Sequence, residues 1–421
     1  MNQSNESSIE SQSKLWNRSF IAVCLSSFFL FMTFYMLAVT LPLFVTESLG
    51  GKESQVGLVM TSFIVSAVIF RPLTGKWMDE ISRRKLILTA LLIFAGCTAM
   101  YPFIHSYPML LGLRLLHGIG FGMASTATGA VAVEIVPDHR KGEGVGYFSL
   151  FMSLAMVVGP FLGLSIMQTH NNMLLFGICI LFAVLSLLCG AILRIPARKE
   201  TIGVTSQKGW RKFVEPRALP ISLTGSVLAF SYGAITTFLS VYAKEMGLGS
   251  YSSYFFMVFA LMIVLSRPFT GKLFDRSGPH VLVYPGVILF TLGMIALSMA
   301  HSPIVFLGAG GMLGLGFGAM LPSYQTIAVQ SAPPHRRGLA TGTYFLLFDS
   351  GYGIGSSVLG AVAAGSSFQT MYFIAGIVVA GSAILYYTLF HRQQSKSRKS
   401  ASGADGVNDA HEATIPHVAS E

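Results

Sequence analysis

The residues that could do chemistry in this chain are few, ionisable and set inside long apolar runs. Asp349 lies in the run 340–363, and Arg114 and His117 lie one helical turn apart in the run 108–130. An ionisable group at the centre of a bilayer costs at least ~2.5–3.5 kcal/mol, so such residues usually have a function. A buried carboxyl favours its neutral form and a histidine titrates near neutral pH, so this pattern predicts proton transfer.

Asp349 is the first candidate for a coupling proton, because it is the one acidic residue placed in the middle of an apolar run. Its ionised form would require water, Arg114 or another donor as a partner. His117 is the next candidate. A structural role stays open for Asp349 and His117, as hydrogen-bonded groups that hold neighbouring helices together.

The composition is that of an integral membrane protein. The chain has 421 residues, of which 52% are hydrophobic and 11% are charged, whereas soluble domains carry about 25% charged residues. A helix crosses the hydrocarbon core with about 20 residues, and the four cysteines lie in apolar runs as packing residues. The sequence predicts twelve transmembrane helices in an all-α protein, near residues 18–44, 55–75, 86–104, 108–130, 144–167, 172–194, 218–244, 251–271, 281–301, 303–329, 340–363 and 368–390.

Basic residues predict the orientation of these helices, because cytoplasmic loops retain Lys and Arg. With the N-terminus inside, the outer loops hold only Lys52 and Lys244. We therefore expect a multi-pass protein of the plasma (cell) membrane with a cytoplasmic tail at each end, residues 1–17 and 391–421, and a cytoplasmic linker at 195–217. This topology explains the net charge of +10, and we expect no nucleic-acid partner.

A repeat divides the chain into two halves. The stretch "RPLTGKWMD" at 71–79 returns as "RPFTGKLFD" at 267–275, an offset of 267 − 71 = 196. The same offset aligns glycines of the runs 108–130 and 303–329. The simplest explanation is two parallel six-helix halves, residues 18–194 and 218–390. Such repeats place a substrate site at mid-depth between halves that rock to expose it alternately.

Over residues 18–390 the chain resembles the major facilitator superfamily. The family's signature after its second helix stands here as Gly75, Asp79 and the basic residues 83–85, with a weaker copy at Gly271 and Asp275. The second copy has Gly-Pro-His at 278–280 where the first has Ser-Arg-Arg at 82–84. The first loop is therefore expected to carry most of the gating role.

Two further motifs carry the resemblance. The family's fourth-helix pattern matches Arg114, Gly118 and Gly120, and the fifth-helix pattern associated with exporters matches Gly159, Pro160 and Gly163. Ala155 stands where that second pattern usually has a glycine. The resemblance is to the drug/proton antiporter branch, which includes multidrug and metallophore exporters.

The loop motif predicts a conformational latch. Gly75 would allow close helix packing, Asp79 would accept hydrogen bonds from a neighbouring helix N-terminus, and Arg83 would pair with Glu134 across the cytoplasmic rim. Gly271 and Asp275 would form the second copy of this latch, with Arg276. Alternatively, the basic residues only set the topology.

Pro160 removes a backbone donor and bends its helix, while Gly159 and Gly163 give it a face without side chains. This segment is expected to act as a hinge or seal, although ordinary packing would also explain it. The resemblance places helices 1, 4, 7 and 10 around the cavity, and their aromatic, weakly polar composition suits an amphipathic solute. The cavity candidates are Phe34, Tyr35, Phe121, Phe230, Tyr232, Phe238, Tyr324 and Gln325.

The sequence therefore predicts a secondary transporter, not an enzyme. We expect proton-coupled efflux of small, moderately hydrophobic organic compounds by alternating access, without a cofactor or metal and with the proton gradient as energy source. An importer of a small metabolite, or an exporter dedicated to a siderophore-like metallophore, remains an alternative. The expected partners are the solute, protons and membrane lipid, and the protein is expected to be a monomer.

Overall fold

The computed structural model describes residues 15–137, 140–169, 171–195, 214–333 and 336–391. Most of the predicted tails and linker lies outside these ranges. Within the helices, the side chains of Asp79 and Asp275 and the surroundings of Gly271 also lie outside the described part.

Twelve long helices make up the described fold, and each is long and apolar enough to cross a membrane. The described residues contain no strand. The predicted all-α class and its twelve spans are confirmed. The helices are α2 (Arg18–Leu43), α3 (Glu53–Glu80), α4 (Arg83–Met100), α5 (Tyr107–Ile135), α6 (Lys141–Met167), α7 (Asn172–Ile192), α8 (Leu219–Glu245), α9 (Ser252–Ser277), α10 (His280–Ser298), α11 (Pro303–Gln330), α12 (Arg337–Gly365) and α13 (Phe368–Tyr386).

Short irregular turns extend several of these helices. A π-helical turn, Phe44–Ser48, continues α2, and another, Tyr387–His391, continues α13. Single 3-10 turns follow α4 at Tyr101–Phe103 and precede α8 and α9 at Pro216–Ala218 and Gly249–Tyr251.

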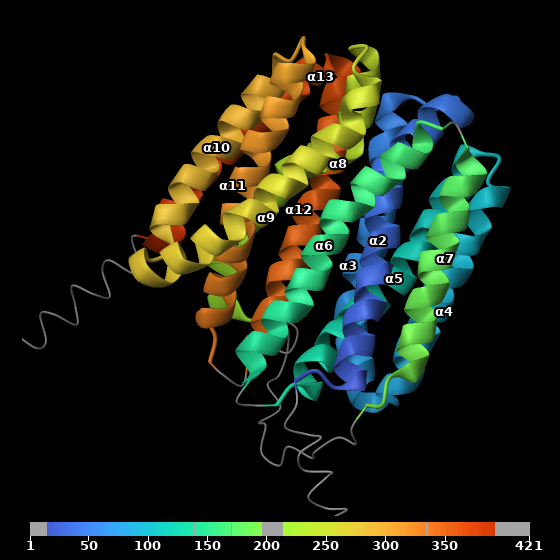
Figure 1. The fold of residues 1–421 in the computed structure, drawn as a ribbon, viewed down its shortest axis with the longest axis vertical. Coiled ribbons are helices and arrows are strands. Elements are labelled where there is room, and N and C mark those ends of the chain that lie inside the picture. The colour runs from blue at the N-terminus through green and yellow to red at the C-terminus, as the bar shows by residue number, and fades with distance from the viewer. Residues whose placement is uncertain (1–14, 138–139, 170, 196–213, 334–335, 392–421) are drawn as a thin grey trace, which may run out of the picture.

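The two halves, α2–α7 and α8–α13, lie side by side and repeat the same packing (Figure 1). In the first half α3 packs on α5, α5 on α4, and α2 on α6 and α7; in the second, α9 packs on α11, α11 on α10, and α8 on α12 and α13. Contacts between the halves obey the same symmetry, because α3 packs on α12, α6 on α9, and α2 on α8.

The repeated glycines allow these close contacts. A Cβ added at Gly118 would lie 2.2 Å from the carbonyl oxygen of Phe63, and one added at Gly314 would lie 2.2 Å from that of Phe259. The offset of 196 relates both members of these pairs (314 − 118 and 259 − 63). Any larger residue would separate the helices, so the sequence repeat records one packing arrangement used twice.

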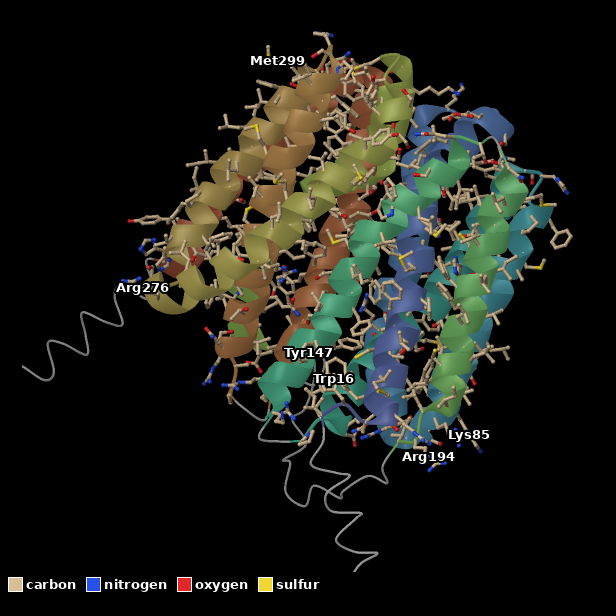
Figure 2. The ribbon with its side chains drawn as sticks, in the orientation of Figure 1. Trp16, Lys85, Tyr147, Arg194, Arg276 and Met299 are labelled. Carbon is tan, nitrogen blue, oxygen red and sulfur yellow. The ribbon has the colours of Figure 1, made fainter. Side chains whose placement is uncertain are left out.

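The molecule has two ends, which we call the inner and outer sides. The inner side carries the start of α4 with Lys85 and the end of α7 near Arg194, and the outer side carries Met299 after α10 (Figure 2). Lys52 and Lys244 lie on the outer side, in an open groove between the halves. That the inner side is cytoplasmic stays a prediction from the basic residues.

Candidate functional site

An ion pair joins the two halves near mid-depth. Nη2 of Arg71, on α3, lies 2.5 Å from Oδ2 of Asp349, near the middle of α12. The two side chains are only 15% and 17% exposed. Arg71 Nε and Asp349 Oδ2 have no hydrogen-bond partner among the described residues, so the contact is an ion pair without hydrogen-bond geometry. The sequence left water, Arg114 or another donor open as the partner of Asp349; in this structure the partner is Arg71.

Two tyrosines lie near this ion pair. Tyr35 of α2 lies within electrostatic range of both Asp349 and Tyr352. Tyr352, one turn after Asp349 on α12, accepts a 2.8 Å hydrogen bond from Thr236 of α8. The carboxylate therefore contacts one guanidinium and has two phenols in its neighbourhood, which are groups able to stabilise its charge or relay a proton.

A second contact between the halves repeats the first one. Nη2 of Arg267, on α9, donates a 2.9 Å hydrogen bond to Oγ of Ser153, on α6. The offset of 196 relates Arg71 to Arg267 and Ser153 to Asp349 (349 − 153). In both contacts the arginine of one half reaches across to a side chain of the other half. The signal for this was in the sequence, because an arginine repeated inside two apolar runs requires a partner.

Arg114 is enclosed within the first half. It is 0% exposed, and Nε donates to the carbonyl of Val59 at 3.3 Å while Nη1 donates to the hydroxyl of Tyr101 at 3.3 Å. Nη2 contacts the sulfur of Met60 at 3.4 Å, and the guanidinium lies 4.0 Å from the centre of the Phe63 ring. All of these partners are neutral. The contacts give Arg114 a role in holding α5 against α3 and the end of α4.

His117 is held by both ring nitrogens. Nε2 hydrogen-bonds with Thr98 at 3.2 Å and Nδ1 with Tyr101 at 3.0 Å, and the ring packs on Phe94. These contacts match the structural alternative for His117. A role of His117 in proton coupling stays a prediction.

The inner rim contains part of the predicted latch. Arg83, at the start of α4, forms an ion pair with Glu134, at the end of α5, and Arg84 donates to the carbonyl of Ala191 at the end of α7. The side chains of Asp79 and Asp275 lie outside the described part. A Cβ added at Gly75 would meet no atom of the described residues within 4 Å. The close packing expected there is therefore not seen in this structure.

The predicted hinge lies in an unbroken helix. Pro160 is inside α6, which runs from Lys141 to Met167. A Cβ at Gly159 would lie 2.8 Å from Cβ of Tyr35, and one at Gly163 would lie 3.2 Å from the backbone of Met36. These glycines therefore seal α6 against α2, and a hinge role stays a prediction.

Most of the predicted cavity residues pack inside their own half. Phe34 and Phe121 stack on each other and on Phe63, Phe238 packs on Phe368, and Tyr324 is fully buried near Tyr386. Tyr232 is 3% exposed and packs on Phe317. Only Tyr35, Phe230 and Gln325 are partly exposed. That these residues line a substrate cavity stays a prediction, because apolar pattern alone does not separate a cavity wall from a helix interface.

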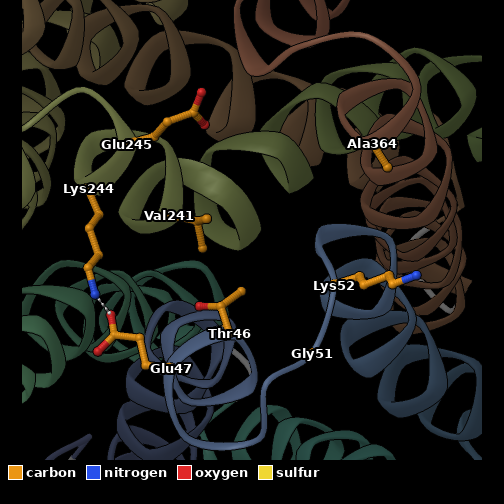
Figure 3. Close-up of a pocket in the computed structure, with 8 residues that line it drawn as sticks. All are labelled: Thr46, Glu47, Gly51, Lys52, Val241, Lys244, Glu245 and Ala364. Carbon is orange, nitrogen blue, oxygen red and sulfur yellow. Dashed lines mark ion pairs between the residues drawn. The ribbon is translucent and has the colours of Figure 1, made fainter.

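Contacts between the halves close the outer side. Nζ of Lys244, on α8, lies 2.7 Å from Oε1 of Glu47 (Figure 3). Thr61 of α3 hydrogen-bonds with Ser357 of α12 at 2.6 Å, and Ser240 of α8 donates to the Val39 carbonyl of α2 at 3.1 Å.

Around the outer ion pair the surface is hollowed into an open groove of about 690 Å³. Residues of both halves line this groove: Thr46, Glu47, Gly51, Lys52, Val241, Lys244, Glu245 and Ala364 (Figure 3). The groove marks the outer end of the interface between the halves.

Solved structures with the same fold are transporters. A mutant of the nucleoside transporter NupG has a TM-score of 0.71 and 14% identity, covering 89% of this chain and 100% of that one. A bacterial homolog of the human lysosomal transporter Spinster, inward-facing and occupied, has a TM-score of 0.70 and 14% identity, covering 88% and 96%. At these identities the likeness concerns the fold.

Relatives in sequence include exporters. The staphylopine export protein of Staphylococcus aureus (strain Mu50) is 23% identical over 350 residues, 79% of this chain and 86% of that protein. The multi-drug resistance efflux pump PmrA of Streptococcus pneumoniae serotype 4 is 26% identical over 364 residues, covering 82% and 89%.

The family profile of the Major Facilitator Superfamily matches residues 23–356 and, in a second match, 285–416. The two matches cover the twelve helices almost completely. Together with the repeated packing of the halves, this match shows that the chain is a multi-pass membrane transporter that belongs to the Major Facilitator Superfamily.

Proposed function

We propose that this transporter is a proton-coupled exporter of small, moderately hydrophobic organic compounds in the plasma membrane. The observation that carries the proposal is the ion pair between Arg71 and Asp349, which joins the halves near mid-depth. Protonation of Asp349 removes one of the two charges that hold α3 to α12. Proton binding therefore acts directly on a contact between the two bodies that rock during alternating access.

The strength of this contact suits a switch. An exposed ion pair contributes at most ~1 kcal/mol, and removing one partner of a fully buried pair costs ~3–5 kcal/mol. Arg71 and Asp349 lie between these limits, at 15% and 17% exposure. A change of ~1–3 kcal/mol shifts a two-state equilibrium about 5- to 150-fold, which is enough to direct a transport cycle.

The direction and the class of substrate rest on other observations. Alignments with two relatives cover about four fifths of this chain, and these relatives are named as an export protein and an efflux pump. Their names support export as the direction of transport. Tyr35, Phe230 and Gln325 are the partly exposed cavity candidates, and they offer two aromatic rings together with one hydroxyl and one amide. Such a lining favours an amphipathic solute over a sugar.

An exporter dedicated to a metallophore is the second candidate, and the likeness to the staphylopine export protein favours it. An organic molecule with several polar groups would then be the substrate. The two candidates share the fold, the direction and the proton switch, and they differ in the compounds transported.

Inverted membrane vesicles test the proposal. We expect vesicles that contain the protein to accumulate compounds from a panel of amphipathic dyes and metallophore-like chelators when their lumen is acidified, and a protonophore should stop the accumulation. Cells that lack the protein should retain more of the same compounds. Loss of preloaded compound from acidified vesicles, or reduced uptake by the deletion strain, would indicate an importer instead.

A further inference from the structure

The two halves contact each other through one arrangement built twice, with one chemical difference. Arg71 of α3 meets Asp349 of α12, and Arg267 of α9 meets Ser153 of α6. Each arginine precedes a proline in the repeated motif, and each partner lies near the middle of its own helix. The guanidinium is present in both contacts, whereas the carboxylate is present in only one.

The guanidinium of Arg267 is only partly satisfied. Among the described residues its one hydrogen-bond partner is the hydroxyl of Ser153, and it forms no ion pair. A charged side chain within a membrane is costly unless it is paired or faces water. The hydroxyl of Ser153 offsets the cost of burying this charge less than a carboxylate would. The chain therefore keeps the cation of Arg267 without the partner that would compensate its charge best.

The geometry at Ser153 is suited to a carboxylate. Its Oγ lies 2.9 Å from Nη2 of Arg267, and an aspartate extends from the same Cβ by one further bond. The repeat already shows the result, because the equivalent aspartate, Asp349, lies 2.5 Å from Arg71. The backbone at position 153 therefore places an acidic side chain within reach of Arg267.

We propose that Arg267 and Ser153 form a latent copy of the coupling site, and that the absence of a carboxylate at position 153 limits the transporter to one titrating contact between its halves. The inference rests on the proposed function of Asp349 as the proton carrier. In the natural protein pH changes within the physiological range leave the contact of Arg267 formed, because neither partner titrates there. One interface therefore responds to protons while its symmetry mate serves as a fixed tether.

The charged and titratable groups around the two contacts are consistent with this assignment. Asp349 faces Arg71 from α3, Tyr35 from α2 and Tyr352 from its own helix. Among the described residues, Ser153 has one charged neighbour in hydrogen-bond contact, Arg267 from α9. An acid placed at position 153 would thus meet the same type of partner as Asp349.

The test exchanges the two side chains. Spin labels at Lys52→Cys and Glu245→Cys report the outer opening, because these residues line the outer groove from opposite halves. The four native cysteines are replaced by alanine. The double electron–electron resonance distance distribution is then recorded in nanodiscs between pH 5 and pH 9, which needs no substrate.

We expect a single pH transition in the labelled parent and less than a tenth of its amplitude in Asp349→Ser. The exchange Asp349→Ser with Ser153→Asp should restore the transition, and Ser153→Asp alone should make it steeper or split it in two. Ser153→Asn is the matched control, because it places a neutral side chain of the same size beside Arg267 and should add no second transition. Ser153→Glu with Asp349→Ser serves as a second exchange if the first variant does not yield a folded protein.

Two failures are distinguishable. A pH transition that persists in Asp349→Ser would overturn the proposed function, because the proton would then bind elsewhere. A transition lost in Asp349→Ser and restored by neither exchange variant, with both variants monodisperse, would overturn the latent site while leaving the role of Asp349 intact.

Discussion

Gly57 on α3 offers a way to shift the transporter between its states without changing any charge. A Cβ at this position would lie 2.4 Å from the carbonyl oxygen of Ser356 on α12. Ordinary contact begins near 3.4 Å, so Gly57→Ala requires the outer parts of these helices to separate by about 3.4 − 2.4 = 1.0 Å. The clash exists only while the outer side is closed, because α3 and α12 belong to opposite halves.

The expected size of the effect follows from the overpacking. Forcing an extra methyl group into a close-packed contact costs ~1–3 kcal/mol, which corresponds to a 5- to 150-fold change in an equilibrium constant. The gain in helix propensity from glycine to alanine, up to ~1 kcal/mol, is the same in both states and cancels. We therefore expect Gly57→Ala to increase the ratio of the outer-open to the outer-closed population about 5- to 150-fold.

Spin labels at Lys52→Cys and Glu245→Cys measure this population as the share of long distances. Gly112→Ala is the matched control, because a Cβ at Gly112 meets no atom within 4 Å. The reasoning would be refuted if Gly57→Ala and Gly112→Ala gave the same distance distribution, or if Gly57→Ala favoured the short distances.

Three further changes address other contacts. Glu47→Gln removes the outer ion pair with Lys244. Because both groups are partly exposed, this change should favour outer opening by at most ~1 kcal/mol. Adding 0.5 M salt to the labelled parent protein should shift its distance distribution in the same way. Arg114→Ala leaves buried partners without a donor and should cost ~1–3 kcal/mol, visible as a lower unfolding temperature of the purified protein. Asp79→Asn should reduce vesicle transport with little change in ligand affinity, and Asp275→Asn should have a milder effect; normal transport by a well-expressed Asp79→Asn protein would contradict the latch.

The sequence predicted the helices because each span is a continuous apolar run, and length alone identifies such runs. The residues at which the helices begin and end were harder to predict. The span expected at 86–104 begins as α4 at Arg83, because the basic residues of the loop continue the helix beyond the apolar core. The offset of 196 also predicted which glycines are equivalent, and Gly118 and Gly314 make the same contact in their halves.

The contacts between the halves could not be predicted in the same way. Asp349 was identified because a lone carboxylate in an apolar run is rare, but its partner depends on how two separate six-helix bodies dock. Hydropathy carries no information on docking, so the sequence could name Arg114 or another donor but could not single out Arg71. The cavity residues stay a prediction for a related reason, since Phe121 and Phe238 have the composition of a cavity wall and pack on other aromatic rings in this structure.

The measurement that tests the central claim most directly is substrate-driven proton movement in proteoliposomes. A compound identified by the vesicle panel is added on one side, and a pH-sensitive dye records proton flow for the natural protein and for Asp349→Asn. We expect Asp349→Asn to abolish the proton signal while exchange of labelled for unlabelled compound continues, because the ion pair with Arg71 is the contact through which the proton acts. Proton movement that is unchanged in Asp349→Asn would contradict the claim and move the coupling role to His117 or to another group.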